Sequence, residues 1–215
     1  MELVTFLIDF ILHVDKHLEV FVQNYGAWVY ALLFVIIFVE TGLVVMPFLP
    51  GDSLLFVVGA LCGAGLMDIR VAMGLMLVAA IAGDQVNYSI GRFFGPKVFQ
   101  WEHSRFFNRH AFDQAHAFYE TYGGITIILA RFMPFIRTFA PFVAGVAEMT
   151  RSKFTAYNVI GALIWVVGLT AAGYWFGNLP WVQANLSKII WAMILIPGLF
   201  VLFGAWKARC KAAAA

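Results

Sequence analysis

The chain has 215 residues, of which 62% are hydrophobic and 12% are charged, with a formal net charge of +2. Soluble domains carry about 25% charged residues, so this composition and the mean hydropathy of +0.85 exclude a soluble domain and predict an all-α integral membrane protein. The small net charge gives no indication of a nucleic-acid partner, and the length allows a single membrane domain.

The N-terminal segment 1–22 predicts an amphipathic helix that lies in the membrane surface. Its polar residues recur at helical spacing, while apolar residues cover the remaining faces, which is the pattern of an interfacial helix. A plain first spanning helix is the alternative. The polar face is formed by Glu2, Thr5, Asp9, His13 and Lys16.

Residues 27–95 predict a first structural repeat. An apolar helix begins near residue 27 and is interrupted by Glu40, which makes it short for a span of about 20 residues. A helical hairpin is expected at about 40–65, followed by a spanning helix that carries Asp84.

The remaining elements follow in the same order a second time. Residues 96–122 form a polar stretch with helical periodicity and predict a second amphipathic surface helix. Residues 123–177 predict a second repeat, with its hairpin at about 123–147 and a spanning helix after it. Residues 184–206 predict a last spanning helix, and 207–215 form a basic tail.

The turns of both hairpins are expected at residues that break helices. These are Pro47, Pro50 and Gly51 in the first hairpin and Pro134 and Pro141 in the second. Prolines within an apolar helix end or kink it. Because broken backbone at membrane depth persists only inside protein or beside a watery cavity, we expect two opposed re-entrant hairpins.

Two pairs of segments resemble each other, which suggests an inverted repeat within a polytopic helical bundle. Residues 47–49 (PFL) are similar to 134–136 (PFI), and 88–95 are similar to 170–177. Paired interrupted segments in corresponding halves point to the binding site of a transporter. Chance similarity is the alternative, since the match is weak residue by residue.

The basic residues predict the orientation of the chain. Lys and Arg are concentrated in 92–122, 148–153 and the tail, whereas 178–188 contains only Lys188. Cytoplasmic loops carry the excess of basic residues, so a multi-pass protein with a cytoplasmic C-terminus is expected.

Three acids within apolar surroundings are candidates for proton or sodium coupling: Glu40, Asp52 and Asp84. Ionisable groups inside a membrane are costly and usually functional. A carboxylate in a site of low dielectric exchanges protons nearer neutral pH than one in water. The structural alternative is that each acid only forms an ion pair or hydrogen bond that stabilises the fold.

Arg131 and Arg137 are the candidate substrate-binding residues. Arginine offers a planar fork that binds phosphate, and a helix break between the two would let them converge. They therefore suggest a membrane-soluble substrate with a phosphate group, such as a lipid. The alternative is a pair of structural salt bridges to Glu40 and Asp52.

Signals for enzymatic or metal chemistry are weak. Cys62 and Cys210 have no motif partner, and the pair His13 and His17 lacks a third ligand, so no metal or cofactor is predicted. A lipid phosphatase would need a nucleophile or metal beside the arginines, and the sequence offers none there. A proton-coupled exporter of small cations or drugs remains a second hypothesis, and a homo-oligomer is compatible with the sequence.

Four stretches resemble the DedA family of bacterial inner-membrane proteins, which carry the VTT (SNARE-associated) domain. The similarity extends from the first helix to about residue 180. The stretches are 38–45 (FVETGLVV), 47–56 (PFLPGDSLLF), 83–92 (GDQVNYSIGR) and 130–145 (ARFMPFIRTFAPFVAG).

The resemblance implies a flippase, driven by a proton or sodium gradient, that moves undecaprenyl phosphate or a phospholipid across the cytoplasmic membrane. Related eukaryotic members are lipid scramblases. It also implies that two re-entrant hairpins face each other, and that Glu40, Asp52, Arg131 and Arg137 are needed for function.

Overall fold

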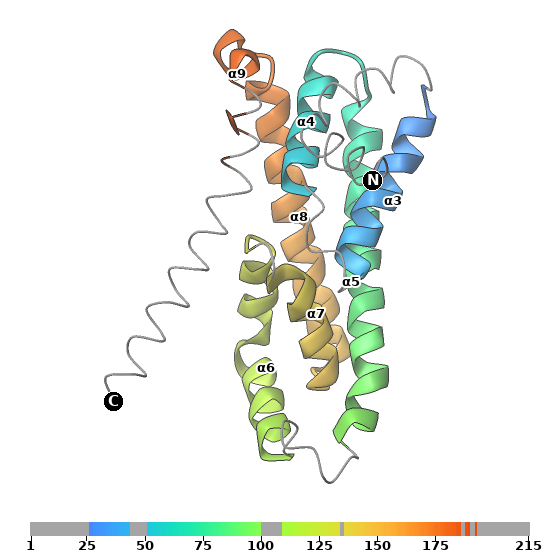
Figure 1. The fold of residues 1–215 in the computed structure, drawn as a ribbon, viewed down its shortest axis with the longest axis vertical. Coiled ribbons are helices and arrows are strands. Elements are labelled where there is room, and N and C mark those ends of the chain that lie inside the picture. The colour runs from blue at the N-terminus through green and yellow to red at the C-terminus, as the bar shows by residue number, and fades with distance from the viewer. Residues whose placement is uncertain are drawn as a thin grey trace, which may run out of the picture.

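The computed structural model describes residues 26–43, 51–99, 109–133, 136–185, 188, 189 and 192, with the backbone alone for 96–99 and 109–115. All regular structure in these ranges is helical (Figure 1). The helices are α3 (Trp28–Gly42), α4 (Gly51–Gly63), α5 (Ile69–Phe99), α6 (Arg109–Ala130), α7 (Ile136–Val146), α8 (Arg151–Phe176) and α9 (Pro180–Ala184). The helix predicted at 1–22, nearly all of the span predicted at 184–206 and the tail lie outside the described residues.

Two long helices, α5 and α8, form the frame of the molecule and pack against each other. Their segments 69–95 and 151–176 contain 27 and 26 residues and are long and apolar enough to cross a membrane, which takes about 20 residues. Asp68 begins α5 as an N-cap: its Oδ1 accepts hydrogen bonds from the backbone N–H groups of Arg70 at 2.7 Å and Val71 at 3.1 Å.

The other four helices of the body form two hairpins that meet near the middle of this frame. In Figure 1, α3 and α4 lie toward one end of the long helices, and α6 and α7 toward the other. Helix α4 packs on α8, and α7 packs on α5. The two short helices α4 and α7 therefore each pack on the long helix that lies in the other half of the sequence.

The two short helices end in the same turn. At the end of α4, the N–H of Gly65 bonds to Cys62 O and that of Leu66 bonds to Leu61 O, each at 3.0 Å. At the end of α7, the N–H of Glu148 bonds to Gly145 O and that of Met149 bonds to Ala144 O, also at 3.0 Å. Gly65 and Glu148 have φ values of 78° and 55°. Both turns are Schellman motifs with a left-handed residue.

The boundary predicted between a surface helix at 96–122 and a hairpin at 123–147 is wrong. Helix α5 continues to Phe99, and α6 runs unbroken from Arg109 to Ala130. Glycine in a helix costs only about 1 kcal/mol, and here Gly123 and Gly124 provide space. A Cβ at Gly124 would overlap the ring of Tyr157 in α8.

Pro141 also departs from the prediction, because it lies inside α7 and not in a turn. A proline lacks the N–H that would bond to the carbonyl four residues earlier. The carbonyl that loses its partner here is that of Arg137, and two nearby carbonyls of α7 accept hydrogen bonds from other helices. Asn87 Nδ2 donates to Thr138 O at 2.8 Å, and the Tyr119 hydroxyl donates to Ala140 O at 3.4 Å. Pro47, Pro50 and Pro134 lie outside the described residues.

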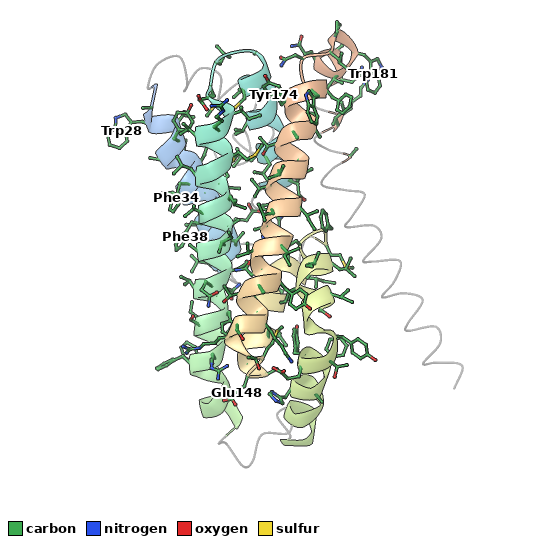
Figure 2. All side chains as sticks on the ribbon, turned by 180° about the vertical axis from the view of Figure 1, so that it is seen from behind. Trp28, Phe34, Phe38, Glu148, Tyr174 and Trp181 are labelled. Carbon is green, nitrogen blue, oxygen red and sulfur yellow. The ribbon has the colours of Figure 1, made fainter. Side chains whose placement is uncertain are left out.

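The distribution of polarity is that of a membrane protein. Large apolar side chains are exposed on the outer face of α8, at Ile160, Leu163, Ile164 and Val167, while Glu40, Asp84, Asn87, Arg131 and Asn158 are buried. Figure 2 places Trp28, Tyr174 and Trp181 at one end of the molecule and Glu148 at the other. Aromatic side chains at the end of an apolar bundle are typical of a membrane interface.

Candidate functional site

Arg137 connects the two hairpins through acids on both helices of the first. It lies in the first turn of α7, and its Nη1 donates to Asp52 Oδ1 at 2.9 Å, while its Nη2 pairs with Glu40 Oε1. Glu40 lies in the last turn of α3 and is fully buried, and Asp52 is the second residue of α4. A single guanidinium thus joins α3, α4 and α7.

Gly51 brings the N-terminus of α4 onto the Glu40 carboxylate. Its backbone N–H donates to Glu40 Oε1 at 3.2 Å, and a Cβ at this position would overlap that carboxylate. The N-terminal end of a helix carries a partial positive charge that favours an anion. Predicted as a turn residue, Gly51 is the first residue of α4, directly after the undescribed segment 44–50.

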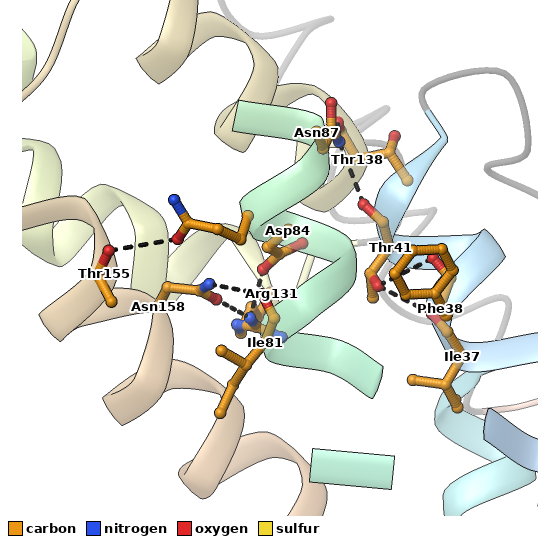
Figure 3. Close-up of polar contacts among 11 residues, drawn as sticks. Ile37, Phe38, Thr41, Ile81, Asp84, Asn87, Arg131, Thr138, Thr155 and Asn158 are labelled. Atoms are coloured by element: carbon orange, nitrogen blue, oxygen red, sulfur yellow. Dashed lines mark hydrogen bonds and ion pairs between the residues drawn. The ribbon is translucent and has the colours of Figure 1, made fainter. Parts of the chain in front are cut away.

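Arg131 forms a second buried network with both long helices. It directly follows α6, its Nη2 pairs with Asp84 Oδ2 in α5, and the same nitrogen donates to Asn158 Oδ1 in α8 (Figure 3). Asn158 Nδ2 in turn donates to Ile81 O at 3.1 Å. Gly161 makes room for this arginine, because a Cβ there would lie 3.0 Å from Arg131 Cδ.

Trp165 lies between the two networks. Its Nε1 donates to Asp52 Oδ1 at 2.7 Å. Its ring centroid is 5.3 Å from Arg137 Cζ and 5.9 Å from Arg131 Cζ, within the range of cation–π attraction. Both networks therefore belong to one central charge cluster, defined here as Glu40, Asp52, Asp84, Arg131 and Arg137.

Asn87 links the ends of the two hairpins to α5, one turn beyond Asp84. Its Nδ2 donates to Thr41 O at 3.2 Å and to Thr138 O at 2.8 Å (Figure 3). The first carbonyl belongs to the last turn of α3, whose carbonyls have no helical partner. One amide group thus fixes the end of α3 relative to α7.

The cluster lies near the middle of the frame. Asp84 in α5 and Trp165 in α8 are each about 15–25 Å from either end of their apolar segments, at about 1.5 Å per residue. Among the described residues, Glu40 Oε2 and Arg131 Nε are buried without a hydrogen-bond partner. Buried unpaired groups are costly and demand an explanation, and a binding site provides one.

All five charged residues singled out from the sequence come together, but one pairing differs from the structural alternative. That alternative paired both arginines with Glu40 and Asp52, whereas Arg131 pairs with Asp84. The difference follows from where the two arginines lie. Arg131 follows α6, which packs on α8, and α8 in turn packs on α5, the helix that carries Asp84. Arg137 lies in the first turn of α7, close to the end of α3 and the start of α4.

Sequence reasoning missed Asn158, Gly161 and Trp165 in α8. A signal was present, because residues 158, 161 and 165 fall on one helical face at spacings of three, four and seven. A polar amide, a glycine and a tryptophan on one face of an apolar helix indicate close contact with a polar neighbour. Asn87, three residues after Asp84, is a comparable signal.

Comparison with known proteins supports one family. The family model of the VTT domain matches residues 49–175. Protein DedA of Escherichia coli K12 is 56% identical over 218 residues, covering 99% of this chain and 100% of the relative. No solved structure matches the chain.

More distant relatives agree with this result. An uncharacterised membrane protein of Mycobacterium leprae is 48% identical, covering 80% of this chain and 77% of its own length. Inner membrane protein YqjA of E. coli K12 is 34% identical, covering 81% and 80%. These names support a membrane location and carry no enzymatic activity. The chain therefore belongs to the DedA family of membrane proteins and contains its VTT domain.

Proposed function

We propose that this protein is a flippase that moves a phosphate-bearing lipid, such as undecaprenyl phosphate or a phospholipid, across the bacterial cytoplasmic membrane. The observation that carries the proposal is the central charge cluster, in which the buried Arg131 and Arg137, whose side chain is 10% exposed, lie at the meeting point of two helical hairpins. Charged groups at this depth are expensive and are typical of substrate and ion pathways.

The arginines fit a phosphate because each now holds the group that a phosphate would replace. Arg137 binds two carboxylates and Arg131 binds one. A lipid phosphate offers the same planar pairing to a guanidinium. Binding would exchange a carboxylate–arginine pair for a phosphate–arginine pair.

The charge balance of the cluster supports coupling to a cation gradient. Three carboxylates, Glu40, Asp52 and Asp84, face two guanidinium groups, so the fully ionised cluster carries one excess negative charge. An uncompensated buried charge is strongly unfavourable. A proton on one acid, or a bound Na⁺, neutralises the cluster, and release of an arginine by a protonated acid would free it for phosphate.

The arrangement of the hairpins suggests how access could alternate. We propose that α3–α4 and α6–α7 are re-entrant hairpins of an inverted repeat, whose first half spans residues 27–95 and whose second half begins with α6 and ends at residue 177, with the C-terminus on the cytoplasmic side. Support comes from the meeting of the two hairpins near the middle of α5 and α8. It also comes from the packing of α4 on α8 and of α7 on α5, so that each short helix contacts the long helix of the other half. Transporters built this way bind substrate at the repeat interface.

The excess acid equally favours a second candidate, a proton-coupled exporter of small cations or drugs. The two functions differ in what must cross the membrane. An exporter produces proton flux that depends on an added cationic substrate, and it moves no labelled lipid between the leaflets. The buried arginines argue against a cationic substrate, because like charges repel at short range.

A transport assay tests the proposal. Purified protein in phosphatidylcholine vesicles should move a labelled polyprenyl monophosphate between leaflets, and Arg137→Ala should abolish this movement. Lys153→Ala is the matched control, because it removes a cation that is about half exposed and pairs with Glu120 away from the central charge cluster. Movement by Arg137→Ala at the wild-type rate would rule out phosphate binding at this residue. Release of inorganic phosphate would instead indicate a lipid phosphatase.

A further inference from the structure

Trp165 is placed differently from an ordinary core aromatic residue. It is 1% exposed, near the middle of α8. Asp52 Oδ1 accepts a hydrogen bond from its Nε1 and another from Arg137 Nη1, at 2.7 and 2.9 Å. Its ring contacts both arginines of the central charge cluster. The indole is therefore in contact with one member of the Arg131–Asp84 network and two members of the Arg137 network.

The ring can hold both arginines because of its charge distribution. The face of an indole attracts cations, and the attraction increases in a buried site from which water is excluded. Two guanidinium groups in one buried cluster repel each other. A shared aromatic ring reduces the cost of keeping them close, and the N–H bond to Asp52 fixes the orientation of the ring.

A role in packing alone does not account for these contacts. Phe154, eleven residues earlier on the same helix, is fully buried and stacks on Tyr88 with ring centroids 4.2 Å apart. Its ring packs on another aromatic ring of the core. Trp165 fills a comparable volume but also presents a hydrogen-bond donor and an aromatic face to charged groups.

We propose that Trp165 is a positioning residue that joins Arg131 and Arg137 into a single binding site for the phosphate group of the lipid. This inference rests on the proposed function and adds to it that the two arginines bind cooperatively. Without the ring, each arginine would remain paired with its own acid and would act independently.

A double-mutant cycle tests cooperativity directly. The dissociation constant of a fluorescent polyprenyl monophosphate is measured for the full chain in phosphatidylcholine nanodiscs, with Arg131→Lys, Arg137→Lys and both together. In the wild-type background the two losses are expected to be non-additive, because interacting residues couple. In the Trp165→Leu background the fold-losses in affinity caused by the two arginine substitutions should simply multiply, which means that the arginines are no longer coupled. The affinity of Trp165→Leu itself should be about tenfold lower than that of the wild type.

Conservative and control variants separate positioning from packing. Trp165→Phe keeps an aromatic face, so its affinity should stay within about threefold of the wild type and the coupling should persist. Phe154→Leu removes an aromatic ring from the same helix, and should leave both affinity and coupling unchanged. Loss of coupling in Trp165→Phe would overturn the role of the ring, and this holds even where Trp165→Leu does not fold.

Two further results distinguish this inference from the proposed function. Wild-type protein that neither binds nor moves a labelled polyprenyl monophosphate or a labelled phospholipid overturns both. Wild-type protein that moves the lipid, together with unchanged affinity and coupling in Trp165→Leu, overturns the role of Trp165 alone. An equal loss of affinity in Trp165→Leu and Phe154→Leu would assign the effect to packing and overturn it as well.

Discussion

Gly91 in α5 and Gly173 in α8 occupy equivalent places in two helix contacts. A Cβ at Gly91 would overlap the carbonyl of Phe142 in α7, and a Cβ at Gly173 would overlap the carbonyl of Phe56 in α4. Small residues let helix backbones approach closely, which is a main source of helix association in membranes. These contacts hold each short helix, and thus Arg137 and Asp52, in position.

The first prediction concerns these glycines. Gly173→Ala and Gly91→Ala should each lower the free energy of unfolding by about 1–3 kcal/mol, because a methyl group is forced into a neighbouring backbone. Gly168→Ala on α8 is the control, since nothing lies within 4 Å of its Cβ position. It should be neutral or stabilising by up to about 1 kcal/mol. Thermal unfolding in detergent measures all three, and equal losses would contradict the packing argument.

The second prediction concerns the buried pair of Arg131 and Asp84. Arg131→Gln should destabilise the protein by about 3–5 kcal/mol, because it leaves a buried carboxylate without its partner. Adding Asp84→Asn should recover most of that loss. Transport should remain absent in the double variant, because its phosphate-binding arginine is gone.

Unfolding and transport measured on the same preparations separate these effects. The exposed pair of Lys153 and Glu120 serves as the control, because exposed ion pairs contribute only about 0–1 kcal/mol. A double variant that is no more stable than Arg131→Gln would show that Asp84 does not depend on this arginine for its burial.

The third prediction concerns Glu148, which ends α7 with a φ of 55°. A residue with a Cβ pays about 1–2 kcal/mol in this conformation, whereas glycine does not. Glu148→Gly should therefore stabilise the protein by about 1 kcal/mol in thermal unfolding. Glu148→Ala should give no such gain, and Gly65→Ala in the equivalent turn, where φ is 78°, should lose a similar amount. A gain in the alanine variant would point to the charge of Glu148 instead.

The fourth prediction concerns Glu120, which lies outside the two long apolar segments. Its bond with the Lys153 ammonium, followed by the bonds from the N–H and hydroxyl of Thr150, lowers its pKa from 4.5 to about 2. Because the pKa is lower in the folded state, the stabilisation is present above about pH 4.5 and is lost as the pH falls toward 2. Glu120→Gln should therefore melt below the wild type at pH 6.

The difference in melting temperature between Glu120→Gln and wild type should shrink between about pH 4.5 and 2. Melting temperatures across this range provide the measurement. A difference that stays constant down to pH 2 would mean that the ionised form of Glu120 does not carry the stabilisation. Since the Glu120 side chain is 25% exposed and that of Lys153 is 48% exposed, high salt should also reduce the difference.

Helix breakers and charges in the sequence located most of the site, for physical reasons that act locally. Prolines and a glycine at 47–51 and a proline at 134 interrupt apolar segments. The structure ends α3 before the first group, starts α4 at its last residue, Gly51, and starts α7 after Pro134. Glu40 and Arg137 stood out because ionisable groups are expensive among apolar residues. Pro141 misled the prediction, because the packing of α7 against α5 and α6 is invisible in the local sequence.

What the sequence alone determined is the class of protein, the positions of the interrupted helices and the five charged residues, since each depends on the cost of placing a residue in an apolar environment. The tertiary structure alone decided that Arg131 pairs with Asp84, that Arg137 pairs with Glu40 and Asp52, and that Trp165 contacts both arginines. Such partners depend on which helices pack together. The helices that pack together are set by the close approach of α4 to α8 and of α7 to α5. These segments lie far apart in the sequence, so no local pattern predicts their contact.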